Sequence, residues 1–347
     1  MPNEILSDAI NAVCRGEELS EERAAIVLRE VMEGRSAPEE TAGFLIALRT
    51  RGETADEIAG LARTMRELAT KVVVGIDGLL DTAGTGGGTP TFNVSTTAAF
   101  VAAGAGCPVA KHGNRSSTSR SGSADLLEAL GVNIELGPEA VSRCIDEIGF
   151  GFMFAPRHHA AMKYVVPVRK ELAVRTIFNF LGPLTNPAGA KRQLLGVSDR
   201  RYQETIAEAL VGLGCERALV VCGADGVDEI SIADRTRVIE VAEGGTEEWF
   251  ADPAELGLEI AHLDAIAGGS PEENAAVVKR VLDGEAGPPR DVVAMNAGAA
   301  ILAGGLAEDL PGGMERAADA IDSGAARGVL DRLVETTREL ATDATDG

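Results

Sequence analysis

From Val72 onward, short apolar runs that suit buried strands alternate with amphipathic stretches that suit helices, and this alternation constrains the fold most. The apolar runs lie at residues 72–82, 107–111, 132–136, 150–155, 193–197 and 217–223. The helical stretches begin near Ser95, Ser121, Pro138 and Arg200, and one more runs through Lys170. Strands that alternate with helices predict a mostly parallel sheet covered on both faces. The order of the strands is not readable from this pattern.

Residues 1–70 show helical patterns only. Apolar residues recur at helical spacing in residues 5–13, and a second helix is expected in residues 20–32. Two spacings typical of helix-capping boxes follow, one from Ser36 to Glu39 and one from Thr54 to Glu57. This part of the chain therefore predicts a small helical bundle.

These patterns predict an α/β protein with a small all-helical N-terminal domain and a larger α/β domain that has a mostly parallel central sheet. The small domain comprises residues 1–70, and residues 165–189, which contain an apolar run and a Pro/Gly-rich turn, are expected to rejoin it. The large domain comprises residues 71–164 and 190–347, and its last part, residues 310–347, has a helical pattern.

The charge balance excludes some classes of partner. Acidic residues number 54 against 32 basic ones, so the formal net charge is -22. A field of this sign repels nucleic acids and anionic membranes, and we expect neither as a partner. The five cysteines form no CxxC pair, and no stretch predicts a signal peptide or a membrane span. The expected location is the cytoplasm.

A stretch rich in glycine follows the first predicted strand of the large domain. This glycine-rich loop, residues 84–91, reads GTGGGTPT and precedes a helix that we expect to be capped by Ser95 and Thr96. Bare backbone N–H groups and the positive end of a helix dipole together favour a phosphate group. The loop is neither a P-loop nor a dinucleotide fingerprint. An ordinary glycine-rich turn is the alternative.

A second loop, here called the basic loop, also follows a strand and precedes a helix. It spans residues 109–125, and ten positions of it contain Lys111, His112, Asn114, Arg115, four consecutive hydroxyl residues and Arg120. Such side chains donate hydrogen bonds to phosphate oxygens, although a solvated basic turn is the alternative. Loops that leave the carboxyl ends of parallel strands share one crevice, so a small phosphorylated ligand is expected between the two loops.

A third segment supplies the opposite charge. This acidic turn, residues 222–230, carries Asp225, Asp228 and Glu229 directly after the apolar strand at residues 217–223. Mg²⁺ binds one or two carboxylates and completes its shell with water and phosphate oxygens, so the turn predicts a magnesium site. A solvated acidic turn is the alternative in so acidic a chain.

Four groups of motifs occur in order along the chain. They are GTGG with FNVST, VAKHGNRS with GSADLLEALG, FAPRHHAAMK with VRKEL and FNFLGPLTNP, and DGVDEI. From about residue 5 to about residue 340, the sequence resembles the anthranilate phosphoribosyltransferase family of tryptophan biosynthesis. The resemblance implies a pentosyltransferase that moves the phosphoribosyl group of phosphoribosyl pyrophosphate (PRPP) to the amine of anthranilate, releasing pyrophosphate. It also implies a pair of Mg²⁺ ions and a homodimer formed through the small domain.

The resemblance assigns a role to each matching residue. The PRPP contacts that it implies are Gly84, Gly87, Gly88, Thr91, Asn93, Val94, Ser95, Thr96, Lys111, His112, Gly113, Asn114, Arg115, Ser116, Ser117, Thr118, Ser119 and Ser123. The anthranilate contacts that it implies are Gly84, Asn114, Arg169, His112, His159 and Pro183, and the magnesium ligands are Ser95, Asp228 and Glu229. Without the resemblance, Arg169 fits a surface arginine and His159 fits a structural histidine.

The sequence departs from the family pattern in two places. Gly88 stands where the family usually has Asp, and the glycine-rich loop is one residue short before Phe92. Ala160 stands where a proline is common. The first departure removes an acidic contact from this loop, and the second is expected to alter only the local start of a helix.

The implied reaction needs no strong base. An aromatic amine is largely neutral at pH 7, so it can attack the ribose carbon first and lose its proton afterwards. We therefore expect no essential general acid or base, and catalysis through positioning, charge stabilisation and exclusion of water. Two other functions remain open: a pyrimidine nucleoside phosphorylase, which shares the architecture, and a non-catalytic paralogue that binds nucleic acid.

Overall fold

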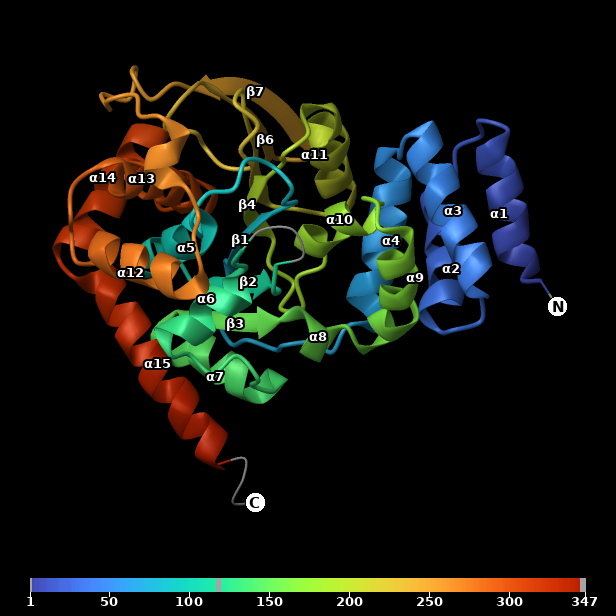
Figure 1. Cartoon of the computed structure of the whole chain (residues 1–347), viewed down its shortest axis with the longest axis horizontal. Helices are drawn as coiled ribbons and strands as arrows, with labels where there is room; N and C mark the ends of the chain where they lie inside the picture. The colour runs from blue at the N-terminus through green and yellow to red at the C-terminus, as the bar shows by residue number, and fades with distance from the viewer. Residues whose placement is uncertain (1, 117–119, 344–347) are drawn as a thin grey trace.

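Four helices at the start of the chain form a bundle. The computed structural model describes residues 2–116 and 120–343. The bundle consists of α1 (Glu4–Cys14), α2 (Glu21–Met32), α3 (Pro38–Arg51) and α4 (Ala55–Leu68). It lies at one end of the molecule, with α9 (Val166–Leu172) packed against α3 (Figure 1). The small all-helical domain predicted from the sequence is therefore present.

One of the two predicted capping boxes is correct. Thr54 caps α4, and the Glu57 side chain accepts a hydrogen bond from the Thr54 N–H. The other box is wrong by one residue, because α3 begins after Ala37 and its N–H donates to Glu40 at 2.8 Å.

Seven strands form one sheet in the order β3-β2-β1-β4-β5-β6-β7. They are β1 (Leu80–Gly84), β2 (Val109–Gly113), β3 (Phe150–Phe154), β4 (Arg192–Gly196), β5 (Arg217–Gly223), β6 (Thr236–Ala242) and β7 (Gly245–Ala251). The first five are mutually parallel, and β6 and β7 add an antiparallel hairpin. The sheet is mostly parallel, as predicted.

Helices cover both faces of the sheet (Figure 1). They are α5 (Val94–Gly104), α6 (Ser123–Leu130), α7 (Pro138–Ile148), α11 (Gln203–Gly212), α12 (Pro271–Leu282), α13 (Pro288–Ala303), α14 (Leu310–Asp322) and α15 (Ala325–Asp343). Leu194 faces the core that contains α5 and α13, whereas its neighbour Leu195 faces the core that contains α11 and the bundle. This alternation is the period of two that a strand imposes.

Residues 165–184 contribute to the same core as the bundle. Val165, Phe178 and Leu184 are buried there with Phe44 of α3, and this core also includes residues of β4, β5 and β6. This segment includes the short helices α10 (Phe178–Leu181) and η2 (Gly182–Leu184). The assignment of residues 165–189 to the small domain stays a prediction, because the two parts of the molecule share this core.

Two expectations about secondary structure are wrong. Residues 132–136 form no strand, because the Asn133 N–H donates to the Thr337 hydroxyl of α15 instead of to a neighbouring strand. The helix expected through Lys170 is divided into α8 (Ala155–His158), η1 (Ala160–Tyr164) and α9. Within the apolar run at residues 72–82, the strand predicted at residues 79–82 is present as β1, which begins at Leu80.

Two short helices follow strands: η3 (Arg200–Tyr202) comes after β4, and η4 (Leu263–Ile266) comes after β7.

None of the helices within residues 2–116 and 120–343 combines the length and apolar character that crossing a bilayer requires.

Candidate functional site

The glycine-rich loop lies at the carboxyl end of β1. In the sheet, β1 lies between β2 on one side and β4 on the other. Gly86 and Gly87 have φ values of 63° and 82°, a left-handed conformation that favours glycine. The N–H groups of Gly87 and Gly88 donate no hydrogen bond to any residue that the structure describes. Two adjacent backbone donors are therefore available to an anion.

The helix after this loop begins one residue earlier than expected. Its N-cap is Asn93, and Ser95 and Thr96 lie in the first turn of α5. The Asn93 side chain does not cap the helix but pairs with Ser121, donating to its carbonyl at 3.2 Å and accepting from its hydroxyl at 3.1 Å. Thr96 donates to the Ser123 hydroxyl at 3.0 Å. The segment that follows the glycine-rich loop thus contacts residues 121–123, where α6 begins.

Lys111 lies inside the sheet and not in solvent. Its side chain is 1% exposed, and Nζ donates to the carbonyl and hydroxyl oxygens of Thr82 at 2.5 and 3.2 Å. Burial lowers the pKa of Lys111 to about 8 and raises the pKa of the nearby Asp81 carboxyl to about 6. Asp81 accepts from the His112 N–H and from Asn186. This buried network joins β1 to β2, the strands from which the glycine-rich loop and the basic loop leave.

The arginines of the basic loop are engaged by carboxylates. Arg115 forms ion pairs with Asp125 at 3.2 Å and with Glu128, and Arg120 lies 4.0 Å from Glu273. The PRPP contact that the resemblance implies for Arg115 stays a prediction. Gly113 ends β2, which pairs with β1, and Asn114 and Ser116 follow it. The remaining predicted contacts, Ser117, Thr118 and Ser119, lie outside the described residues.

The acidic turn contacts the glycine-rich loop directly. Asp228 Oδ2 accepts from the Gly86 N–H at 2.8 Å, and Thr91 donates to Glu229 Oε1 at 3.0 Å. A Cβ at Gly84 would lie 2.5 Å from Asp228 Oδ2, so a side chain at this position would displace the Asp228 carboxylate. Asp225, by contrast, accepts from the Ser231 hydroxyl and from the Val227 N–H, which gives it a structural role within the turn.

The two remaining carboxylates are electrostatically crowded. Burial raises the pKa of Asp228, and burial together with the Asp228 charge raises the pKa of Glu229 well above its ordinary value. The third predicted ligand, Ser95, lies in the first turn of α5, and its carbonyl accepts a hydrogen bond from Thr82 at 2.9 Å. No group of three or more His, Cys, Asp or Glu within the described ranges has a metal-binding arrangement. A pair of carboxylates fits Mg²⁺ that also binds phosphate oxygens.

Three histidines gather beside the loops. The rings of His112 and His159 are 5.1 Å apart, and both are at least nine-tenths buried. His112 Nδ1 lies 3.2 Å from the Gly182 carbonyl, next to the buried Pro183, and His158 Nδ1 lies 3.0 Å from the Thr70 carbonyl. Burial lowers the pKa of His112 to about 3 and that of His159 to about 4, so both rings are neutral at pH 7.

Arg169 is a half-buried cation. Its guanidinium makes no hydrogen bond or ion pair with any of the described residues, and it lies 5.7 Å from the centre of the Phe178 ring. Burial lowers its pKa. In a chain with 54 acidic residues, a half-buried arginine without a carboxylate partner is suited to the carboxylate of a ligand.

The departures from the family pattern have visible consequences. A Cβ at Gly88 would lie 2.4 Å from the carbonyl oxygen of Gly226, so no side chain fits there. The Thr89 N–H donates to the same carbonyl at 3.3 Å, and the shortened loop is thereby closed against the acidic turn. Ala160 is exposed and starts η1.

Several residues around the loop have no signal in the sequence. Arg175 donates to the carbonyls of Thr85 and Gly86, Ser198 donates to the Gly86 carbonyl, and Asn274 donates to Asn93. Each is distant in sequence from the loop that it contacts, so neither spacing nor composition could identify it.

The chain is similar to known proteins over most of its length. Residues 76–327 match the glycosyl transferase family, a/b domain, and residues 7–69 match the glycosyl transferase family, helical bundle domain. The anthranilate phosphoribosyltransferase of Rubrobacter xylanophilus is 53% identical over 339 residues, which cover 97% of this chain and 99% of that protein. The enzyme of the same name from Desulfatibacillum aliphaticivorans is 50% identical, and the alignment covers 96% of this chain and 99% of that protein.

Solved structures agree with these relatives. The crystal structure of the anthranilate phosphoribosyltransferase from Thermus thermophilus superposes with a TM-score of 0.90 at 50% identity, covering 95% of this chain and 99% of that one. The Saccharomyces cerevisiae enzyme in complex with PRPP and Mg superposes with a TM-score of 0.86 at 29% identity, covering 96% of this chain and 98% of that one. The proteins from Rubrobacter xylanophilus, Desulfatibacillum aliphaticivorans and Thermus thermophilus share at least half of their aligned residues with this chain over nearly its whole length, and all three are anthranilate phosphoribosyltransferases. They decide against a phosphorylase and against a nucleic-acid-binding paralogue. The chain belongs to the anthranilate phosphoribosyltransferase family.

Proposed function

We propose that the crevice between the glycine-rich loop, the basic loop and the acidic turn binds magnesium and PRPP, and that Arg169 binds anthranilate. One observation carries the proposal: the N–H groups of Gly87 and Gly88, which donate to none of the described residues, lie in the loop that Asp228 and Glu229 contact. Anion donors and crowded carboxylates side by side suit a pyrophosphate with its metal, as in the yeast relative with PRPP and Mg.

The residues of this chain then have separate roles. Gly87 and Gly88 donate to pyrophosphate oxygens, Asp228 and Glu229 hold the metal, and the first turn of α5 directs its positive end at the same group. When bound, magnesium neutralises charge on the departing pyrophosphate. We propose that a pair of Mg²⁺ ions binds with PRPP.

In this proposal, anthranilate binds on the side of the ribose opposite the pyrophosphate. Arg169 forms a forked contact with its carboxylate, and the buried rings of His112 and His159 line the approach with Pro183. Because both imidazoles are neutral, they neither repel Arg169 nor supply a strong base at pH 7. The amine attacks the ribose carbon while the loops hold the pyrophosphate, and its proton leaves after the new bond has formed.

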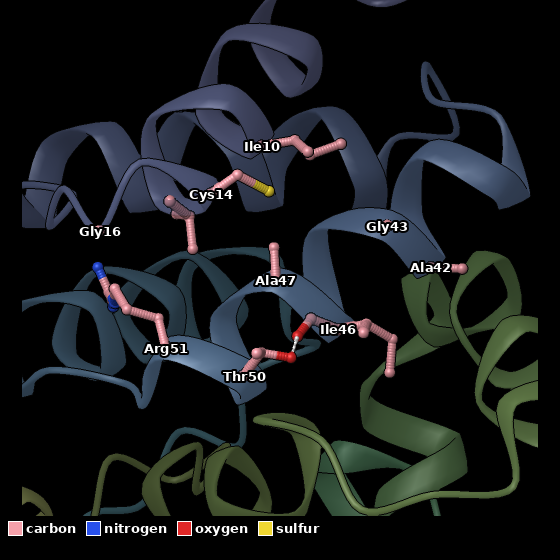
Figure 2. Close-up of a pocket in the computed structure, with 10 residues that line it drawn as sticks. Ile10, Cys14, Gly16, Ala42, Gly43, Ile46, Ala47, Thr50 and Arg51 are labelled. Carbon is pink, nitrogen blue, oxygen red and sulfur yellow. Dashed lines mark hydrogen bonds between the residues drawn. The ribbon is translucent and has the colours of Figure 1, made fainter.

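A groove on the small domain supports the proposal that the protein is a homodimer. It has a volume of about 780 Å³ and lies between α1 and α3 (Figure 2). Ile10 and Cys14 of α1 and the exposed Ile46 and Thr50 of α3 line it. An apolar groove of this kind on a helical surface suits contact with a second copy of the chain.

The activity is tested by following anthranilate fluorescence. Fluorescence should fall when PRPP and Mg²⁺ are both present, and it should stay constant when EDTA removes the metal or when PRPP is omitted. Constant fluorescence with both substrates and metal would contradict the proposed function.

A further inference from the structure

The side chain of Arg175 crosses the back of the glycine-rich loop. Its Nη1 donates to the Gly86 carbonyl at 2.7 Å, and its Nη2 donates to the Thr85 carbonyl at 3.2 Å. No carboxylate of the described residues lies within ion-pair distance of this guanidinium. Two consecutive backbone carbonyls are thus its principal partners, which is an unusual use of a half-buried cation in an acidic protein.

This contact determines where the loop donors point. In a planar trans peptide, the carbonyl of one residue and the N–H of the next point in opposite directions. When Arg175 holds the Gly86 carbonyl, the Gly87 N–H must therefore point away from Arg175. The same geometry at Thr85 directs the Gly86 N–H away from Arg175, where it donates to Asp228. The guanidinium orients both peptide units.

The loop is shaped to accept this side chain. A Cβ at Gly87 would lie 1.7 Å from Arg175 Nη1, so only glycine lets the guanidinium lie across the loop. Ser198 supports the same peptide from the end of β4, donating to the Gly86 carbonyl at 2.8 Å. The guanidinium also lies 5.9 Å from the centre of the Phe180 ring, which restricts its position.

The backbone of Arg175 connects this loop to the small domain. Arg49 of α3 donates to the Arg175 carbonyl at 2.7 Å. Arg169 lies six positions earlier in the chain on α9, which packs against α3. The segment that carries Arg169 is therefore fixed at one end to the glycine-rich loop and along its length to the bundle.

We propose that Arg175 is a positioning residue that holds the glycine-rich loop in its anion-binding conformation and joins the segment carrying Arg169 to it. It acts through backbone carbonyls and does not touch the substrate. This inference rests on the proposed binding of a pyrophosphate group in that loop. A guanidinium can hold two carbonyls at once, whereas a lysine ammonium is a single point charge and cannot reproduce the fork.

The test compares Arg175→Ala, Arg175→Lys and the control Arg143→Ala, which removes an exposed arginine of α7. Isothermal titration of magnesium pyrophosphate into each protein measures the loop directly, and steady-state assays give KM for PRPP and kcat. For Arg175→Ala we expect the Kd for magnesium pyrophosphate and the KM for PRPP to rise at least tenfold, with kcat at saturation within about threefold of wild type. Arg175→Lys should recover only part of this loss, and Arg143→Ala should match wild type.

Unchanged Kd and KM in Arg175→Ala would overturn the proposal, and so would a fall in kcat with both constants unchanged. If Arg175→Ala fails to fold, as circular dichroism would show, Arg175→Gln takes its place with the same expectations. The titration needs no turnover. A wild-type protein that binds magnesium pyrophosphate better than the variant but does not consume anthranilate would therefore contradict the proposed function and leave this inference intact.

Discussion

Asp228 Oδ2 accepts a hydrogen bond from the backbone N–H of Gly86 at 2.8 Å, which joins two loops that are 142 positions apart in the sequence. Thr91 forms a second contact of this kind with Glu229. The loop that offers backbone donors to an anion is therefore already in contact with the carboxylates suited to its metal.

Replacement of Glu229 by Gln should stabilise the metal-free protein while it abolishes most of the activity. Burial and the Asp228 charge raise the pKa of Glu229 in the folded state, so its ionised form destabilises the fold. In Glu229→Gln, Tm without metal should rise by about 1 to 3 °C at pH 8. The gain should shrink as the pH falls through the raised pKa, because the wild-type carboxyl becomes protonated. Differential scanning calorimetry at pH 8 and pH 5 checks this, and a gain that is larger at pH 5 would contradict it.

Replacement of Arg169 by Ala should weaken anthranilate binding selectively. A charge-assisted hydrogen bond contributes about 1.5 to 3 kcal/mol, so KM for anthranilate should rise about 10- to 100-fold. KM for PRPP should change by less than about threefold, because Arg169 is not part of the glycine-rich loop. Arg157→Ala, at an exposed arginine of α8, is the matched control. Equal increases in both KM values would show that Arg169 acts on the whole site.

The buried histidines should not control the pH dependence of turnover. With pKa values of about 3 and about 4, His112 and His159 stay neutral between pH 6 and pH 8. His112→Asn and His159→Asn should each keep kcat within about tenfold of wild type and keep the shape of the pH profile. Loss of turnover in either variant, with both substrate affinities unchanged, would show that an essential acid or base exists.

The same histidines should affect stability in acid. Their pKa values are below the ordinary value of 6.5, so the unfolded chain binds protons more readily than the folded one. Each ring therefore contributes stability that is present at neutral pH and is lost as the pH falls below about 6.5. Urea unfolding at pH 7 and pH 5 should show a smaller decrease for His112→Asn than for the wild type, and an equal decrease would contradict the low pKa.

Replacement of Ile46 by Arg should separate the proposed dimer. Ile46 is exposed and lines the groove between α1 and α3, where a charge would face an apolar surface of the second copy. Light scattering after size exclusion should give a dimer for the wild type and for the control Ile26→Arg, at an exposed isoleucine of α2 outside the groove. It should give a monomer for Ile46→Arg. A wild-type monomer would exclude the dimer.

Local patterns in the sequence predicted the elements that local physics determines. β1 and α5 are identifiable because a short apolar run ends in glycines and is followed by hydroxyl residues before an apolar helix. Residues 132–136 have the same alternation of buried and open positions as a strand, yet they pack under α15 without a strand partner. Strand partners are long-range, so the alternation could not distinguish the two cases.

The candidate site shows the same limit. Asp228 and Glu229 are recognisable as an acidic turn after a strand, but the engagement of Arg115 by α6 depends on tertiary packing. The burial of Lys111 against Thr82 likewise requires β1 and β2 to be neighbours. Arg175 could not be found at all from its surroundings in the sequence, because its partners are backbone carbonyls 89 and 90 positions away.

The central claim is that the glycine-rich loop and the acidic turn together bind a magnesium-bearing pyrophosphate. Isothermal titration of PRPP into the wild type and into Asp228→Asn, each with Mg²⁺ and with EDTA, tests it most directly. The account predicts saturable binding to the wild type that requires Mg²⁺ and is at least tenfold weaker in Asp228→Asn. Equal PRPP affinity in EDTA, or equal affinity of the two proteins in Mg²⁺, would contradict it.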